Sequence, residues 1–359
     1  MAKSIVLAAG GTGGHLFPAE ALARELLNRG HKVAIITDKR GHAFKSLADD
    51  VGIFCVRAAT FKPGLSAKVK AIIDICRGIV QSVFLLLKLK PDVIVGFGGY
   101  PSFPPLLAGQ ILCKTTVLHE QNAVLGKANI ILACGATKIA TALPDTRGIK
   151  DKDRKKTVVT GNPVRAAICA VRDMPYKASM PTEDFILFIT GGSQAAKAFS
   201  DIVPQAAALL PETLKKRLVA VHQCREEDIE KTKNAYAAAG VRSEVKSFFS
   251  DMPERLAACH LFFGRSGAST VAEIAVVGRP AIFVPLLHAD RQQVYNAEML
   301  VNKGGAWLFM QDSLTSQTLA EKLRELMEHP ALLEKAAAVA RACGEPDAAK
   351  KMADAVESL

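Results

Sequence analysis

Short apolar runs alternate along the first half of the chain with longer segments in which apolar residues recur every three or four positions. These runs predict buried strands at residues 4–9, 32–37, 92–95 and 115–118. The segment between the first two predicts a helix over residues 17–29, which Gly30 ends. Strands that are apolar throughout and separated by helices indicate a doubly wound parallel sheet with helices on both faces.

The second half of the chain repeats this pattern. It predicts strands at residues 185–190, 218–222, 243–247, 261–263 and 281–284, and a helix over residues 194–209. Ile5 and Ile186 each lie in a strand that leads through two glycines to a helix, so we expect two similar α/β domains. The charged, turn-rich stretch from Lys150 to Pro163 is the expected hinge, and the helical tail after Pro330 could cap either domain.

The segment from Lys68 to Lys90 is apolar and basic at once. Six of its apolar residues are spaced so as to share one face of a helix: Ile72, Ile75, Ile79, Val83, Leu86 and Leu87. One interpretation is a core helix of the sheet, and the other is an exposed surface that lies on an anionic bilayer. Both hold if one face packs inward while the end of the helix projects.

Composition narrows the class of protein. A chain of 359 residues with 49% hydrophobic and 23% charged residues is globular, and its length suggests about two domains. Its 46 Lys and Arg against 35 Asp and Glu give a net charge of +11, which favours nucleic acid, nucleotide-sugar phosphates or an anionic membrane as partner. No apolar run is long enough to predict a membrane-spanning helix or a signal peptide. The eight scattered cysteines are typical of reduced thiols in a cytosolic protein.

The loop at residues 10–15, GGTGGH, joins the first strand to the first helix. Its four glycines let main-chain N–H groups approach an anion at the helix N-terminus. The loop matches neither the dinucleotide fingerprint nor a P-loop, and the alternative is a tight turn that binds nothing. His15 follows at the helix start, where the helix dipole disfavours the imidazolium and keeps a neutral base, unless the side chain only caps the helix.

Two more loops are expected at the same edge of the sheet. Residues 96–100, GFGGY, follow one strand, and residues 119–122, HEQN, follow the next. The second resembles the start of a zinc-protease motif, but position 123 is Ala, so zinc is rejected. Polar groups at the carboxyl ends of parallel strands lie where doubly wound folds bind ligands.

The second half carries a denser set of candidates. Residues 191–194, GGSQ, form a turn that leads from a strand into a helix. Residues 265–270, RSGAST, follow another strand and open a helix whose N-terminus suits a diphosphate. Glu273, one turn further, suits the two hydroxyls of a ribose, and the amides and carboxylate of residues 288–293, HADRQQ, suit sugar hydroxyls. For each of these residues taken singly, a place in a solvated loop without a ligand explains the sequence as well as a binding role does.

Seven motifs together resemble the MurG family of bacterial N-acetylglucosaminyltransferases. They are GGTGGH at 10–15, GFGGYPS at 96–102, HEQN at 119–122, GNPVR at 161–165, GGSQ at 191–194, RSGASTVAE at 265–273 and HADRQQ at 288–293. The resemblance implies a GT-B fold, in which two Rossmann-like domains face a cleft. It implies residues 1–162 as an acceptor and membrane-facing domain, 163–340 as the UDP-GlcNAc domain, and a last helix, about 341–359, that packs back on the first.

The resemblance also implies an activity, with UDP-GlcNAc and the undecaprenyl-linked acceptor lipid I as partners. It is an inverting transfer of GlcNAc from UDP-GlcNAc to the muramoyl 4-hydroxyl of lipid I, giving lipid II in peptidoglycan synthesis, without a metal or other cofactor. The resemblance implies a peripheral enzyme on the cytoplasmic face of the bacterial inner membrane, which it contacts through the segment from Lys68 to Lys90. Other cell-wall synthesis proteins are then possible partners. The segment from Lys68 to Lys90 differs in detail from the corresponding segment of that family.

Site residues follow from the same resemblance. His15 is the first candidate for the base and Glu120 the second, with Gly98, Gly99 and Tyr100 in an acceptor-side loop. The residues implied to bind UDP-GlcNAc are Thr12, Gly13, Gly14, Asn122, Arg165, Ser193, Phe249, Ala268, Ser269, Thr270, Val271, Ala272, Glu273, Gln292 and Gln293. Among these, Phe249 meets the uracil through its main chain, at a place where the family often has a smaller aliphatic residue.

Two rival classes follow from the residues. An NAD-dependent oxidoreductase rests on the first glycine loop and on Asp38 at the end of the second strand, but leaves Glu273, Gln292 and Gln293 unexplained. A nucleic-acid-binding protein rests on the charge of +11, but only 6% of the residues are aromatic and no basic recognition helix is evident. An anionic membrane surface is the favoured reason for the charge.

Overall fold

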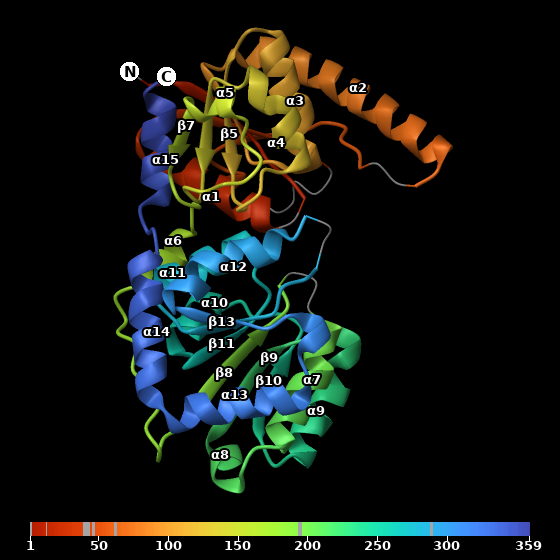
Figure 1. Ribbon diagram of the computed structural model, residues 1–359. Coiled ribbons are helices and arrows are strands. Elements are labelled where there is room, and N and C mark those ends of the chain that lie inside the picture. Colours follow the sequence, from red (N-terminus) through yellow and green to blue (C-terminus); the bar gives the residue numbers. More distant parts are fainter. Residues whose placement is uncertain are drawn as a thin grey trace. The chain divides into compact units, whose positions relative to one another are not determined.

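The computed structural model describes residues 2–11, 13–38, 44, 47–60, 63–192, 196–287 and 290–359. The chain forms two compact units (Figure 1). Unit 1 comprises residues 1–165 and 346–359, and unit 2 comprises residues 166–345. The sequence had placed the corresponding limits at 162 and about 341.

Unit 1 is built on a seven-stranded sheet in the order β3-β2-β1-β4-β5-β6-β7, with every neighbouring pair parallel. Its strands are β1 (Ser4–Ala8), β2 (Lys32–Thr37), β3 (Gly52–Cys55), β4 (Val93–Gly96), β5 (Thr115–Glu120), β6 (Lys138–Thr141) and β7 (Thr157–Val159). Its helices are α1 (Gly13–Asn28), α2 (Leu65–Leu89), α3 (Gly99–Ile111), α4 (Lys127–Leu132), α5 (Asp151–Arg154) and α15 (Ala348–Glu357).

Helices cover both faces of this sheet, as the apolar strands predict. Ile5 and Leu7 of β1 pack in one buried cluster with α1 and α15. Val6 and Ala8 point the other way, into a second cluster with residues of α2, α3 and α4. This alternation follows from the two-residue period of a strand.

The last helix, α15, completes unit 1. Its residues Met352, Ala353 and Val356 are buried in the cluster that also contains α1. At its end, Glu357 accepts hydrogen bonds from His31 Nε2 (2.6 Å) and Arg29 (2.7 Å). These donors, His31 first, hold the pKa of Glu357 below its usual range. The helical tail after Pro330 therefore divides between the units, with α14 (Pro330–Cys343) in unit 2 and α15 in unit 1.

Unit 2 has a six-stranded parallel sheet in the order β10-β9-β8-β11-β12-β13. Its strands are β8 (Phe185–Thr190), β9 (Leu218–Gln223), β10 (Arg242–Lys246), β11 (Leu261–Gly264), β12 (Ala281–Phe283) and β13 (Ala306–Leu308). Besides α14, its helices are α6 (Ala166–Ala170), α7 (Lys197–Ala208), α8 (Glu212–Arg217), α9 (Ile229–Ala238), α10 (Met252–Ala258), α11 (Ala268–Val277), α12 (Gln292–Lys303) and α13 (Ser316–Glu328).

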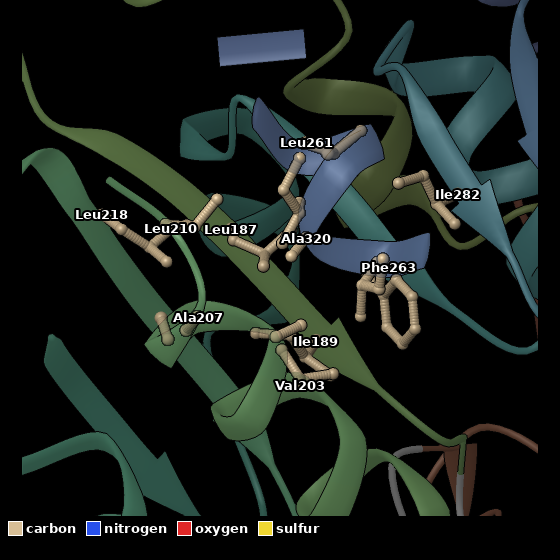
Figure 2. Close-up of a cluster of buried hydrophobic side chains, with 14 of the residues drawn as sticks. Leu187, Ile189, Val203, Ala207, Leu210, Leu218, Leu261, Phe263, Ile282 and Ala320 are labelled. Atoms are coloured by element: carbon tan, nitrogen blue, oxygen red, sulfur yellow. The ribbon is translucent and has the colours of Figure 1, made fainter. Parts of the chain in front are cut away.

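The core of unit 2 lies between its sheet and the helices that cover it. Figure 2 shows Leu187 and Ile189 of β8 packed with Val203 of α7, Phe263 of β11 and Ala320 of α13. The order of these six strands matches the first six positions of the unit 1 sheet, so the prediction of two similar doubly wound domains is confirmed.

Three local predictions were wrong. The first helix begins at Gly13, inside the glycine loop, and not at residue 17. The expected hinge at 150–163 contains α5 and β7, and β7 pairs with β6 as the last strand of the unit 1 sheet. The strand expected at 115–118 runs on to Glu120, so it includes the first two residues of HEQN.

The apolar face expected along α2 packs inward only in part: Leu86 is buried and Ile79 and Val83 pack against the core of unit 1. The fully buried positions of the helix are Ala71, Gly78, Ser82 and Leu86, whereas Ile72 and Leu87 are exposed. A Cβ at Gly78 would lie 1.9 Å from the Arg57 carbonyl oxygen, so the helix packs against main chain at this point. The N-terminal end of α2 projects beyond the rest of unit 1 (Figure 1).

Candidate active site

In each unit the strand order reverses direction beside the first strand, between β1 and β4 in unit 1 and between β8 and β11 in unit 2. Doubly wound folds bind ligands at the carboxyl end of the sheet beside this reversal. The predicted glycine loops after β1, β4, β8 and β11 all leave the sheets at these ends. Thr12 and Ser193 lie outside the described residues, as do Gln194 and His288.

His15 is fixed against the loop that follows β4. Its Nδ1 lies 2.8 Å from the Phe97 carbonyl oxygen. Because a carbonyl oxygen only accepts, Nδ1 must carry the proton and donate it, and the neutral ring then keeps its lone pair on Nε2. The side chain is half-buried. The structure therefore engages Nδ1 of His15 as a donor and leaves Nε2 as the ring nitrogen that could accept a proton.

Gly98 and Gly99 bring the main chain close to this ring. Their φ angles of 76° and 72° lie in the left-handed region that favours glycine. A Cβ at Gly99 would lie 3.3 Å from His15 Cδ2 and 3.4 Å from Nε2, so a larger residue would crowd the nitrogen that carries the lone pair. Tyr100, the next residue, is 52% exposed. The predicted acceptor-side loop and the predicted base thus lie together in unit 1.

Glu120, the second candidate base, is buried and fully engaged. Its Oε1 accepts from the main-chain N–H of Asn122 (3.0 Å) and from Asn122 Nδ2 (3.1 Å). Its Oε2 accepts from the Gly126 N–H (2.8 Å) and from Asn129 Nδ2 (2.8 Å). With four donors on two oxygens, this carboxylate organises the turn between β5 and α4. The geometry favours His15 as the base.

His119 lies beneath this region and is inaccessible to solvent. Its Nε2–H donates to the Gly161 carbonyl (3.2 Å), and its ring packs 5.4 Å from the Phe97 ring, measured between centroids. Burial lowers its pKa to about 4, so it is neutral in the folded protein.

Gly13 and Arg165 are linked through Phe17. A Cβ at Gly13 would lie 2.8 Å from Phe17 Cε2, and the Arg165 guanidinium lies 4.3 Å above the centre of the same ring. Phe17 therefore supports both the glycine loop, which includes Gly14, and the one arginine predicted to meet the diphosphate. The sequence analysis had overlooked Phe17.

In unit 2, helix α11 begins at the carboxyl end of β11. Its N-cap is Gly267, which has no side chain to cap the helix, and the helix starts with the predicted Ala268, Ser269 and Thr270. The positive end of the helix dipole there favours an anion. Ala272 and Glu273 are half-buried, whereas Val271 is buried and its N–H donates to the Gly267 carbonyl (3.0 Å). Val271 thus serves the helix itself.

The start of α12 is tied to the same loop. Ser266 Oγ donates to the Gln293 carbonyl (2.7 Å), and the Leu286 N–H donates to Gln293 Oε1 (2.9 Å). The bond from Leu286 fixes the Gln293 side chain through its oxygen, so that the NH₂ group of the side chain is left as a donor. Gln292, half-buried, is the first residue of the helix.

Phe249 contributes a buried side chain, packed edge-on against Phe188 with ring centroids 5.8 Å apart and beneath Arg255. Only its main chain is available to a ligand, in line with the role implied for it. The neighbouring Phe248 is 72% exposed. At the same edge, Thr190 Oγ1 donates to Gln223 Oε1 (2.6 Å), and Gln223 Nε2 donates to the Ser247 carbonyl (3.2 Å). No motif had indicated this buried chain.

Within the described ranges, no three His, Cys, Asp or Glu residues lie together as a metal site would require. None of the described helices combines the length and hydropathy needed to cross a membrane.

Two Rossmann-like units in one chain, each with glycine-rich loops and helix N-termini at the edge where nucleotides bind, make up the GT-B fold. Comparisons with known proteins specify the family. Residues 5–141 match the Glycosyltransferase family 28 N-terminal domain, and residues 186–359 match its C-terminal domain.

Full-length relatives agree. The chain is 50% identical over 353 residues, 98% of its length and 93% of the relative's, to the UDP-N-acetylglucosamine--N-acetylmuramyl-(pentapeptide) pyrophosphoryl-undecaprenol N-acetylglucosamine transferase of Rhodospirillum centenum. It is 48% identical to the enzyme of the same name from Rhodospirillum rubrum, over 99% of this chain and 91% of that one. The crystal structure of Acinetobacter baumannii MurG has a TM-score of 0.80 at 29% identity, covering 99% of this chain and all of that one. The chain belongs to this family of N-acetylglucosamine transferases, and the family predicted from the motifs is confirmed.

Proposed function

We propose that this protein transfers GlcNAc from UDP-GlcNAc to the muramoyl 4-hydroxyl of undecaprenyl-pyrophosphoryl-MurNAc-pentapeptide, which makes lipid II for peptidoglycan. The observation that carries this is the match, over nearly the whole chain, to enzymes named for that reaction. The oxidoreductase alternative is disfavoured because the loop between β1 and α1 lacks the dinucleotide fingerprint.

In the proposed mechanism His15 is the general base. As the 4-hydroxyl oxygen attacks C1 of GlcNAc, its proton passes to Nε2, and the bond from C1 to the diphosphate oxygen breaks with inversion at C1. The hydrogen bond from Nδ1–H to the Phe97 carbonyl (2.8 Å) holds the ring in the tautomer this step requires and stabilises the imidazolium that forms. Glu120 keeps the neighbouring loop in place and transfers no proton.

The leaving UDP gains negative charge, which the N-terminus of α11 and Arg165 are proposed to stabilise. We propose that Glu273 binds the ribose, the main chain at Phe249 the uracil, and Gln292 and Gln293 the GlcNAc hydroxyls. The fixed NH₂ group of Gln293 supports its part. Helix amides and a guanidinium supply what a metal would otherwise supply, so the reaction is proposed to need no metal.

The test is to incubate the protein with UDP-GlcNAc and a soluble lipid I analogue and to measure UDP release and the disaccharide product. We expect turnover with UDP-GlcNAc, far less with UDP-GalNAc, and no loss when EDTA is added. Absence of product with either sugar would refute the reaction, and loss with EDTA would refute only its metal independence.

We further propose that α2 holds the protein on the cytoplasmic face of an anionic membrane. Large apolar side chains stand exposed along it, led by Leu65 at 82% and Phe84 at 68%. Lys68, Lys70 and Arg77 are exposed beside them. Several of these residues and Arg57 line an open hollow of about 570 Å³. Apolar side chains fringed by cations are what a peripheral helix needs to enter the interface of an anionic bilayer.

Vesicle sedimentation tests this attachment. Binding should be stronger to vesicles that contain phosphatidylglycerol than to phosphatidylcholine alone, and should weaken in salt. The variant L65S/F84S should lose most of the binding but keep turnover of a soluble acceptor. The control L209S removes a leucine of unit 2 that is 52% exposed, and this variant should bind as the unaltered protein does. Equal binding by L65S/F84S would refute the role of α2.

A further inference from the structure

Gln121, the third residue of HEQN, has no role in the mechanism so far. It lies directly after β5, with only 3% of its surface exposed. Its Nε2 donates to the Phe97 carbonyl oxygen at 2.7 Å. This is the oxygen to which His15 Nδ1–H donates at 2.8 Å. A carbonyl oxygen has two lone pairs, so Gln121 and His15 together fill its capacity as an acceptor.

The peptide that carries this oxygen needs support. It connects β4 to two glycines with positive φ, Gly98 and Gly99, and glycine limits the rotation of a neighbouring peptide less than any other residue. The Phe97 ring is buried and packs against His119, which fixes the side chain but not the direction of the carbonyl. The amide of Gln121 approaches that carbonyl from the neighbouring strand and sets its direction.

The oxygen of the same amide is placed unfavourably. Gln121 Oε1 is buried and has no hydrogen-bond partner within the residues that the structure describes. Rotating the amide would give Oε1 no relief, because it would then face the Phe97 carbonyl, another acceptor. A buried polar atom without a partner is unfavourable, and an apolar side chain of the same size would avoid the penalty.

We propose that Gln121 is a positioning residue for catalysis. By holding the Phe97 carbonyl toward His15, it keeps the proton of the imidazole on Nδ1 and the lone pair on Nε2, where the acceptor hydroxyl must deliver its proton. The proposal rests on His15 being the general base of the reaction proposed above. It assigns to a buried residue, Gln121, the task of selecting the tautomer of the proposed base.

The test compares Gln121→Met with Thr141→Val. Methionine matches the length of glutamine without its N–H donors. The Thr141 hydroxyl is buried at the carboxyl end of β6 and also has no partner among the described residues, so its loss controls for a buried polar-to-apolar change at the same sheet edge. If Gln121→Met does not fold, Gln121→Asn keeps the amide but withdraws it by one methylene.

The direct readout is the ¹⁵N spectrum of protein labelled at histidine, recorded at a pH where the His15 ring is neutral. The His15 signals are assigned as those that disappear when His15 is substituted. The unaltered protein should show a protonated Nδ1 and a bare Nε2, and the Gln121 variant should show the two signals drawn together by mixing of tautomers. We expect kcat to fall about 5- to 10-fold, as loss of one buried hydrogen bond implies, with KM for UDP-GlcNAc unchanged. Thr141→Val should alter neither.

An unchanged tautomer in the Gln121 variant overturns the proposal, whether or not kcat falls. A mixed tautomer with unaltered kcat overturns it as well, because positioning would then not matter to the rate. The spectrum needs no turnover. If His15→Ala retained normal activity, the base assignment would fail by itself, and the spectrum would still report what Gln121 does to the ring.

Discussion

Replacing Glu120 by Gln separates a structural carboxylate from a catalytic one. Four N–H donors converge on its two oxygens, from Asn122, Gly126 and Asn129. Whichever way the amide of the new side chain turns, two of these donors face an NH₂ group in place of an oxygen. Hydrogen bonds to a charged group contribute about 1.5–3 kcal/mol each, and partial rearrangement of the asparagines reduces the loss, so we expect unit 1 to lose about 2–4 kcal/mol.

For a unit of this size that loss lowers the unfolding midpoint by roughly 5–15 °C. The chain has a single tryptophan, Trp307, which lies in β13 of unit 2. Its fluorescence therefore follows unit 2, while far-UV circular dichroism follows both units. In Glu120→Gln we expect an early dichroism transition belonging to unit 1 and an unmoved Trp307 transition.

Activity completes the comparison. At a temperature where both units are folded, Glu120→Gln should retain turnover within about tenfold, whereas His15→Ala should lose ~10²–10⁴-fold in kcat with little change in either transition. The reasoning would be refuted if Glu120→Gln unfolded like the unaltered protein and lost as much activity as His15→Ala. The carboxylate would then be the base and its hydrogen bonds incidental.

Two further predictions concern stability. Burial lowers the pKa of His119 in unit 1 to about 4 and that of His222 in unit 2 to about 3. Between pH 7 and pH 5 the unfolded chain takes up protons that the folded units exclude, so each unit should lose about 2 kcal/mol as pH falls, and urea titrations independent of pH would contradict this. Gly78→Ala places a Cβ 1.9 Å from the Arg57 carbonyl oxygen, a main-chain atom, and should cost unit 1 about 3 kcal/mol. Gly240→Ala, where φ is 70° and nothing lies within 4 Å, should cost unit 2 about 1 kcal/mol, and equal losses at both sites would argue against the clash.

Much of the fold could be predicted because its central strands are apolar on both faces. β1, β2 and β8 have the bounds expected, or differ by one residue, and Gly30 ends α1 with a φ of 80° as a C-terminal glycine should. The peripheral strands were missed because their residues give a weaker pattern. β7 is three residues long and half-exposed, and it follows a run of charges typical of a linker. Its pairing with β6 is a long-range property that a local pattern does not carry.

The candidate site was predictable where a motif combines glycine with a functional side chain, as in the loops that bring Gly99 to His15. What remained hidden are contacts through main-chain atoms. The Phe97 carbonyl receives side chains 82 and 24 residues away in the sequence, from His15 and Gln121, and a phenylalanine gives no sign of that role. For Phe249 only the family resemblance indicated a main-chain role, and its aromatic side chain does pack inside the unit.

Helix α15 is made after all of unit 2, yet it belongs to unit 1. Until residues 348–357 leave the ribosome, the nascent unit 1 lacks Met352, Ala353 and Val356 from its core, and Arg29 and His31 lack the carboxylate of Glu357. Translation therefore completes unit 2 before it completes unit 1. Until α15 arrives, the apolar residues of α1 that share its buried cluster lack this cover, so unit 1 completes its core last.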